Sequence, residues 1–230
     1  MKWTLLPFSA NWREGGEPEL EIAVRLHKNL PGATCWDLGS HFGIHTVGLA
    51  RVVGSTGQVC GFEPDPVAFR RLSRHVAMNQ LSWVKLFNAA VSECSGRAEM
   101  LVSGGLGSTF THLRYDDEPV LDNEKKIDIA TVVLDELVAR GEIREPDLIK
   151  VDVQGHGAKA LRGAEKSIRK RLPTIIFSCH CQPEADFVAE LVRKLDYQCL
   201  DSGGKTADIQ NLDLTATYIL TSPKKEIKPV

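Results

Sequence analysis

The sequence predicts an α/β fold in which a mostly parallel sheet carries helices on both faces. Short apolar runs alternate with segments of helical periodicity along most of the 230 residues. The first two runs close on Asp37-Leu38-Gly39 and on Glu63-Pro64, which is typical of strand-to-helix turns. The last two runs follow one another without a helix between them. We therefore expect a Rossmann-like, seven-stranded sheet with an antiparallel end strand.

The expected strands are bounded by glycine, proline and acidic residues, and the expected helices by capping residues. Strands are predicted at 34–38, 58–62, 84–88, 100–102, 127–131, 146–152, 174–177, 197–200 and 216–221. Helices are predicted at 15–30, 42–53, 66–79, 134–140, 158–171 and 184–195. Asp65 is expected to cap the helix that begins at Pro66, because an aspartate accepts the first free amides of a helix and proline tolerates its first turn.

Composition indicates one domain of ordinary globular character. The chain is 43% hydrophobic and carries a net charge of −2, so residues 1–222 are expected to form a single domain. Residues 1–33 would be an N-terminal helical cap, and 223–230 a frayed tail. The glycine-serine loop at 103–109 reads equally as a surface or an active-site loop. The acidic stretch 115–126 is expected to be mobile.

Charge and hydropathy argue against nucleic-acid and membrane partners. The basic runs 70–75 and 166–171 are predicted to be solvated helix faces, because the overall charge leaves no basic footprint. Pro7 interrupts the N-terminal apolar residues before they reach the length of a signal peptide or a membrane span. We therefore expect a cytoplasmic protein.

The cysteine pattern predicts reduced thiols and no metal site. Most of the six cysteines lie in strand-like runs, which suits buried thiols better than a disulfide framework. The one pair at ligand spacing, in Cys179-His180-Cys181, has no second pair to complete a zinc site.

The stretch from Cys35 to Asn79 has the layout of a nucleotide-binding βαβ unit. A strand, a glycine turn, a helix and a second strand ending in an acid follow one another. The turn reads G-S-H-F-G, and His41 and Phe42 stand where a dinucleotide turn keeps glycine for close approach to a pyrophosphate. S-adenosylmethionine carries no phosphate, so the looser turn favours this cofactor over NAD.

Each part of that cofactor has a predicted partner. Asp37 would pair with its ammonium group, directly or through water, and Glu63, 24 residues beyond Gly39, would accept both ribose hydroxyls. Small residues after the third strand would let the adenine lie against the backbone. The predicted cofactor-binding residues are Asp37, Gly39, Ser40, Phe42, Gly43, Glu63, Pro64, Asn88, Ala89, Ala90 and Asp152. The alternative is a doubly wound domain whose turn binds nothing.

Several later motifs add a family resemblance. V-V-L-D-E-L at 132–137, P-D-L-I-K-V-D-V-Q-G at 146–155 and A-L-R-G-A at 160–164 follow D-L-G-S-H-F-G and F-E-P-D-P in the order shown by FkbM-type methyltransferases. The resemblance covers roughly residues 34–180. It implies a class I S-adenosylmethionine-dependent fold and O-methylation of a hydroxyl on a small-molecule acceptor, either a sugar or a secondary metabolite.

The chain also departs from the family pattern. The family commonly has V-E-G-x-E after the strand-end aspartate and an acid before the later histidine, whereas this chain has Gln154, Gly157 and Ser178 at those positions. Cofactor residues are retained, so the departures concern the acceptor and any acid-dependent step.

Methyl transfer to an alcohol needs a group that removes the hydroxyl proton. Asp152 is the first candidate, because it ends a buried run at the carboxyl edge of the sheet, where open α/β sheets bind ligands. His156 and His180 follow, since each comes just after a strand end. His41 and His45 are expected to be helix-start residues.

Two other functions fit parts of the pattern. The missing acids are compatible with a degenerate module that binds or senses the cofactor without transferring its methyl group. An NAD-linked oxidoreductase is disfavoured by the glycine spacing. The sequence indicates no oligomeric state.

Overall fold

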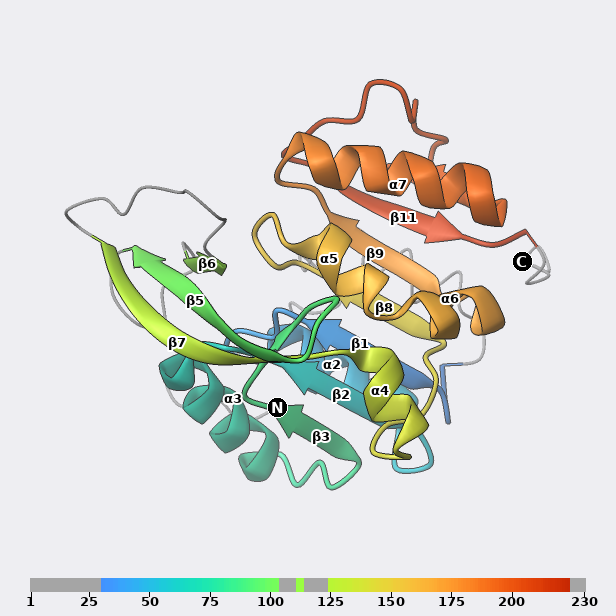
Figure 1. Cartoon of the computed structure of the whole chain (residues 1–230). Coiled ribbons are helices and arrows are strands. Elements are labelled where there is room, and N and C mark those ends of the chain that lie inside the picture. Colours follow the sequence, from blue (N-terminus) through green and yellow to red (C-terminus); the bar gives the residue numbers. More distant parts are fainter. Residues whose placement is uncertain (1–29, 104–110, 114–123, 224–230) are drawn as a thin grey trace.

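The computed structural model describes residues 30–103, 111–113 and 124–223 (Figure 1). The expected helix at 15–30, the glycine-serine loop and the tail lie almost wholly outside these residues and stay predictions. The N-terminal cap falls there too, apart from its last four residues.

A seven-stranded sheet forms the centre of the fold, in the spatial order β10-β11-β9-β8-β1-β2-β3. Its strands are β1 (Thr34–Leu38), β2 (Gln58–Phe62), β3 (Val84–Phe87), β8 (Leu148–Val151), β9 (Thr174–Ser178), β10 (Gln198–Leu200) and β11 (Thr217–Thr221). All pairs are parallel except those of β11, which runs antiparallel to β9 and β10. The predicted fold class is confirmed, with the reversed strand next to the edge of the sheet.

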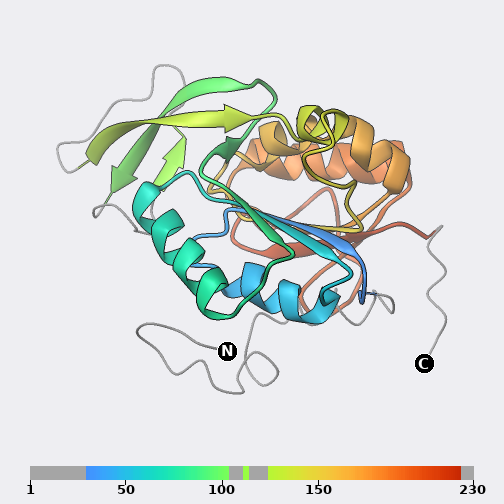
Figure 2. The same ribbon diagram turned by 90° about the horizontal axis from the view of Figure 1, so that it is seen from below.

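Helices cover both faces of the sheet, and Figure 2 shows the three layers from below. They are α2 (Ile44–Val53) and α3 (Pro66–Met78) on one face, and α4 (Leu134–Ala139), α5 (Gly157–Arg162), α6 (Glu165–Arg171) and α7 (Gln182–Leu195) on the other. Side chains of successive strand residues alternate between the two layers. Trp36 and Leu38 pack with α4–α7, whereas Cys35 packs with α2 and α3. Asp37 therefore faces α2.

The starts of α2 and α3 follow from their first residues. Gly43 takes a left-handed conformation, φ 90°, immediately before α2, so that this helix begins at Ile44 and not at Phe42 as expected. The Asp65 side chain accepts hydrogen bonds from the amides of Val67 and Ala68. The predicted cap of α3 is confirmed.

The single helix expected at 158–171 is wrong, because two helices, α5 and α6, occupy these residues. Tertiary contacts break the helix. The carbonyl of Gly163 accepts the amide of Asp135, and the Asp135 carboxylate accepts the amides of Lys166 and Ser167 at the start of α6. A cap supplied from α4 outweighs the continuous helical pattern.

A second sheet, with four strands in the order β4-β7-β5-β6, lies beside the first (Figure 1). Its strands are β4 (Ala90–Val91), β5 (Gly96–Ser103), β6 (Thr111–Leu113) and β7 (Glu124–Val132). The expected strands at 100–102 and 127–131 lie within β5 and β7, which pair antiparallel from Gly96 opposite Thr131 to Ser103 opposite Glu124. Residues 124–126, expected to be mobile, begin β7, and the rest of 115–126 lies outside the described residues.

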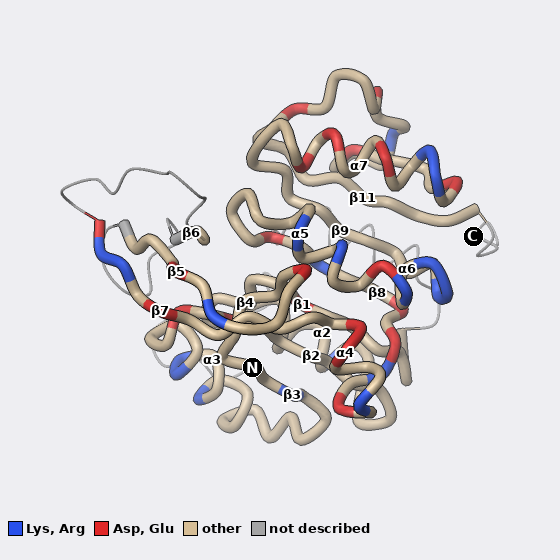
Figure 3. Tube along the Cα trace, in the orientation of Figure 1, with Lys and Arg blue, Asp and Glu red and all other residues tan. Residues whose placement is uncertain are grey.

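The basic run at 166–171 is exposed on α6, as expected. Arg169, Lys170 and Arg171 pair with Glu165, Glu145 and Asp147, respectively. Figure 3 shows Lys and Arg together with Asp and Glu along α7, whereas the charged residues of α3 are all basic. Among the described residues, no helix has the length and apolar character needed to cross a membrane.

Gly39, which follows β1, lies directly against the backbone of Asp152, which follows β8. An added Cβ at Gly39 would lie 1.9 Å from the carbonyl oxygen of Asp152, whereas one at Gly141 would meet nothing within 4 Å. Both glycines have a left-handed φ, +81° and +71°, so alanine at either costs roughly 1–2 kcal/mol of backbone strain. Gly39→Ala should lose about 2 kcal/mol more than Gly141→Ala, because β1 and β8 must also move apart. Urea unfolding of both variants measures this, and equal losses would contradict the steric argument.

Candidate active site

A cavity of about 240 Å³ opens where β1, β2 and β8 end, between the large sheet and the small one. It is lined by Gly39, Ser40, His41, Phe42, Ile44, His45, Phe62, Glu63, Pro64, Ala89, Ala90, Val91, Met100, His112, Leu113, Lys150, Asp152, Val153, Gln154 and His156. The carboxyl ends of parallel strands are where open α/β sheets bind ligands. The cavity is therefore the candidate active site.

The glycine turn forms one side of the cavity. The amides of Gly39 and Ser40 both donate to the carbonyl of Phe62 at the end of β2, at 3.1 and 3.0 Å. A ring nitrogen of His75, on α3, lies 2.8 Å from the carbonyl oxygen of Phe42. The guanidinium of Arg71 stands over the Phe42 ring. The turn is thus fixed from β2 and from α3.

Glu63 is a buried carboxylate at the end of β2. Its two oxygens accept the amides of His41, at 2.7 Å, and Asp65, at 2.8 Å. Burial raises the pKa of Glu63 to about 7, against the lowering effect of those two hydrogen bonds. Near neutral pH, Glu63 at the cavity wall is therefore divided between its protonated and its ionised form.

The segment after β3 completes the same end of the cavity. Ala89 and Ala90 line it, whereas the Asn88 side chain donates to the carbonyls of Glu63 and Pro64, at 2.8 and 3.1 Å. Asn88 therefore holds the loop that carries Glu63 and does not face the cavity.

Asp37 lies behind the cavity wall. Its side chain is fully buried and accepts a hydrogen bond from Thr46 of α2, while its other oxygen lies 3.7 Å from the ammonium of Lys150. Asp37 and Lys150 are cross-strand partners in the register of β1 and β8, so they face the same layer. Lys150 lines the cavity and Asp37 does not.

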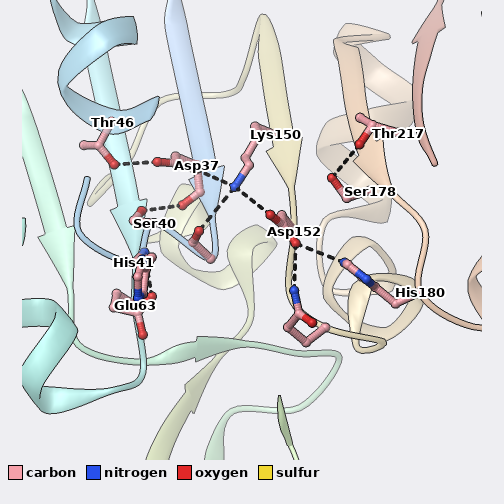
Figure 4. A network of polar contacts seen from close by, with 12 residues as sticks. Asp37, Ser40, His41, Thr46, Glu63, Lys150, Asp152, Ser178, His180 and Thr217 are labelled. Atoms are coloured by element: carbon pink, nitrogen blue, oxygen red, sulfur yellow. Dashed lines mark hydrogen bonds and ion pairs between the residues drawn. The ribbon is translucent and has the colours of Figure 1, made fainter. Parts of the chain in front are cut away.

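Figure 4 shows how Lys150 connects Asp37 to Asp152. The Lys150 ammonium lies 3.6 Å from Asp152 Oδ2 and 3.3 Å from the carbonyl oxygen of Gly39. Asp152 Oδ1 accepts hydrogen bonds from the Gln154 amide at 3.2 Å and from His180 Nε2 at 3.0 Å. Burial alone would raise the pKa of Asp152, but the His180 hydrogen bond and the Lys150 charge hold it well below its usual range.

The two predicted histidines lie in different surroundings. His156 is buried, with its Nε2 3.1 Å from the Ser92 hydroxyl, and burial lowers its pKa to about 4. The His180 side chain is 28% exposed, and its hydrogen bond to Asp152 raises its pKa above 6.5. At neutral pH, His156 is therefore an uncharged imidazole, whereas His180 holds a proton more firmly than an ordinary histidine.

At the three positions where the family commonly has an acid, the structure shows different contacts. Gln154 donates to Asp152, and Ser178 bonds to Thr217. Beside Gly157 lies the carboxylate of Glu184 from α7, which accepts the amides of Gly157 and His180 at 2.7 and 2.8 Å. An added Cβ at Gly157 would lie 2.8 Å from that carboxylate. One buried acid thus joins the loops after β8 and β9.

The structure brings most of the predicted site residues to one cavity. Gly39, Ser40, Phe42, Glu63, Pro64, Ala89, Ala90, Asp152 and His156 line it, whereas Asp37, Gly43, Asn88 and His180 stand behind or beside the wall. Sequence reasoning missed Lys150, His112 and Met100. Met100 and His112 come from the small sheet, which was not expected. The roles of the predicted site residues in binding or catalysis stay predictions.

Comparison with known proteins identifies the family. Residues 37–199 match the methyltransferase FkbM domain. The chain belongs to the FkbM methyltransferase family. This match confirms the resemblance and supports a methyltransferase over the NAD-linked oxidoreductase alternative.

A curated relative and two solved structures extend the comparison. The hexuronic acid methyltransferase AglP of Haloferax volcanii is 26% identical over 184 residues, which cover 77% of this chain and 68% of that protein. Methyltransferase FkbM from Methylobacillus flagellatus superposes with a TM-score of 0.54 at 19% identity, over 82% of this chain and 43% of that protein. This chain thus spans less than half of its length. The SAM-dependent O-methyltransferase TM0748 from Thermotoga maritima gives a TM-score of 0.50 at 12% identity, over 96% of this chain and 67% of that protein.

Family and fold together confirm the predicted cofactor, S-adenosylmethionine. Among the residues that the structure describes, no group of three or more His, Cys, Asp or Glu is arranged to hold a metal ion.

The pKa of Glu63 predicts how folding stability depends on pH. Below its ordinary value of 4.5 the carboxyl is protonated in both states, and between 4.5 and about 7 only the unfolded chain ionises. Stability should therefore fall as pH rises through this window, by about 3 kcal/mol in all, and stay level above it. Glu63→Gln removes this dependence. The difference in unfolding free energy between wild type and variant, from urea titrations at pH 4 and 8, should shift by that amount, and a constant difference would contradict the raised pKa.

Proposed function

We propose that this protein transfers the methyl group of S-adenosylmethionine to a hydroxyl of a sugar, with a hexuronic acid as the first acceptor to test. The observation that carries the proposal is that one cavity is lined by Glu63, at the end of β2, and by Asp152, at the end of β8. The first acid suits the cofactor and the second suits a hydroxyl acceptor. The name of the Haloferax relative supports the sugar class.

The residues at the β2 end of the cavity fit the nucleoside part of the cofactor. Each Glu63 oxygen accepts one backbone amide and keeps capacity for a second donor, which suits the two hydroxyls of a ribose. Pro64, Ala89 and Ala90 offer an apolar surface for the adenine. The absence of a side chain at Gly39 lets β1 and β8 approach beneath this surface.

The fit at the methionine end differs from the sequence-based expectation. Because Lys150 stands between Asp37 and the cavity, we propose that Asp37 does not touch the cofactor and instead holds Lys150 in place. When bound, the cofactor supplies a methyl group on a sulfonium, whose sulfur keeps the electron pair as the new carbon–oxygen bond forms.

The protein must orient the acceptor hydroxyl and remove its proton. Asp152 stays ionised, because its pKa is held well below the usual range, so it can accept a hydrogen bond from the hydroxyl but is a weak proton acceptor. His156, with a pKa of about 4, is weak for the same reason. The hydrogen bond to Asp152 raises the pKa of His180, so it is a stronger base than these two groups, and it is partly exposed, so that the proton can pass to water. We assign orientation to Asp152 and proton removal to His180.

The remaining cavity wall suits a hydroxyl-rich, anionic molecule. His45, His112 and Gln154 supply imidazole and amide groups, while Asp152 is the carboxylate on this side. Imidazole and amide groups donate hydrogen bonds to carboxylates and hydroxyls. A uronic acid carries both.

Removal of the Glu63 carboxylate should weaken cofactor binding. Glu63→Ala leaves the ribose hydroxyls without an acceptor, and the affinity for S-adenosylhomocysteine should fall by about 1.5 to 3 kcal/mol, or roughly 10- to 150-fold. Calorimetric titration measures this. Glu165→Ala, which removes an exposed glutamate on α6, is the matched control and should bind like the wild type. Equal affinities for all three proteins would refute the ribose assignment.

Turnover tests the reaction and its acceptor. With S-adenosylmethionine and glucuronate, wild type should form S-adenosylhomocysteine and a methyl ether, faster than with glucose. Asp152→Asn should cut kcat by about 10² to 10⁴ while cofactor affinity stays nearly unchanged. Tight binding of S-adenosylhomocysteine without turnover of any sugar would support the degenerate binding module.

A further inference from the structure

Lys150 is a lysine in the middle of a buried strand, where charge is costly. Its side chain is 4% exposed, and its neighbours in β8 on the opposite face, Ile149 and Val151, are core residues. A buried ammonium needs negative partners close by. Lys150 has two, one on each side, namely Asp37 across the β1 register and Asp152 two residues along the chain.

The two partners differ in what they can reach. Asp37 is fully buried and bonds to Thr46, so it ends the network inside the protein. Asp152 lines the cavity and bonds to His180, which is partly exposed. The charge on Lys150 therefore links a structural carboxylate to a group that faces the site.

We propose that Lys150 is a positioning residue for the methyl transfer, which fixes the Asp152 carboxylate and limits how firmly His180 holds a proton. This proposal rests on the proposed function. Lys150 acts from behind Asp152. Its ammonium lies 3.6 Å from Asp152 Oδ2, whereas His180 and Gln154 bond to the other oxygen, Oδ1.

The hydrogen bonds determine which nitrogen of His180 can accept a proton. An ionised carboxylate only accepts hydrogen bonds, so His180 Nε2 must carry a hydrogen, and Nδ1 is the basic nitrogen of the neutral ring. Protonation of Nδ1 makes an imidazolium, which Asp152 and Glu184 of α7 stabilise and Lys150 destabilises. Without Lys150, His180 would keep its proton to higher pH and be a poorer acceptor at neutral pH.

The competing interpretation is a purely structural ion pair. A structural Lys150 would hold β1 and β8 together, and its loss would lower stability without a defined effect on His180. The His180 titration separates the two interpretations. A purely structural Lys150 has no defined effect on the His180 pKa, whereas a Lys150 that acts on His180 raises this pKa when the cation is lost, opposite to the loss of an anion.

The experiment is a proton NMR titration of the His180 ring, with its signal assigned by its loss in His180→Gln. Relative to wild type, Lys150→Met should raise the His180 pKa by about 0.5 unit or more, and Asp152→Asn should lower it. Lys150→Arg keeps the charge and should return the titration close to wild type. An unmoved midpoint in Lys150→Met would overturn the proposal.

Lys150→Met removes the cation beside the buried Asp37 and is therefore expected to be less stable than wild type. The double variant Asp37→Asn, Lys150→Met removes both charges and keeps the Thr46 contact available to the asparagine. It should show the same rise in the His180 pKa, since Asp37 is not among the groups facing His180. No rise in a folded double variant would also overturn the proposal.

Activity is a separate readout. The midpoint of kcat against pH should move upward in Lys150→Met and downward in Asp152→Asn, while both bind S-adenosylhomocysteine within about threefold of wild type. A large loss of cofactor affinity with an unmoved midpoint would make Lys150 a cofactor ligand and refute its positioning role. If wild type turns over no acceptor, the proposed function fails, and the NMR titration still decides whether Lys150 controls His180.

Discussion

The site depends on a charge balance that the register of two strands imposes. Because Asp37 and Lys150 are directly opposite each other on β1 and β8, their side chains lie on the same face and share one buried space. Neither could be buried alone, since an uncompensated charge at such a position is strongly destabilising. The backbone contact that permits this register is at Gly39, where any side chain would meet the Asp152 carbonyl. The pair and the glycine thus set how β1 meets β8, and with it the place of Asp152.

The parallel sheet could be predicted well, because its strands and helix starts are marked by residues that are neighbours in the sequence. β1 and β2 have the predicted bounds, and α3 begins where Asp65 and Pro66 indicate. The small sheet was missed, since β4 and β6 have two and three residues, too few to show a period of two, and β4 pairs with β7, which lies far away in the chain. The break between α5 and α6 was missed for the related reason that its cap, Asp135, belongs to another helix.

The candidate site was predictable where an acid ends a strand. Glu63 and Asp152 both follow apolar runs, and parallel topology takes such ends to one edge. Lys150 was not predictable as a site residue, because one lysine within an apolar run gives no sign of its partner until the register is known. His112 depends on the unexpected small sheet. Asp37 was recognised as a site residue, but its position behind Lys150 could not be derived from spacing.

Glu184 shows why a family pattern does not transfer position by position. Gly157 stands where the family commonly has an acid, yet the carboxylate of Glu184, 27 residues further on, lies beside it and accepts its amide. The space left by the glycine is what admits Glu184, since a Cβ there would lie within 2.8 Å of it. Because the same carboxylate accepts the amide of His180, it sets the loop that presents His180 to Asp152. One of the three carboxyl groups missing from this edge in the sequence is therefore supplied in space by another helix.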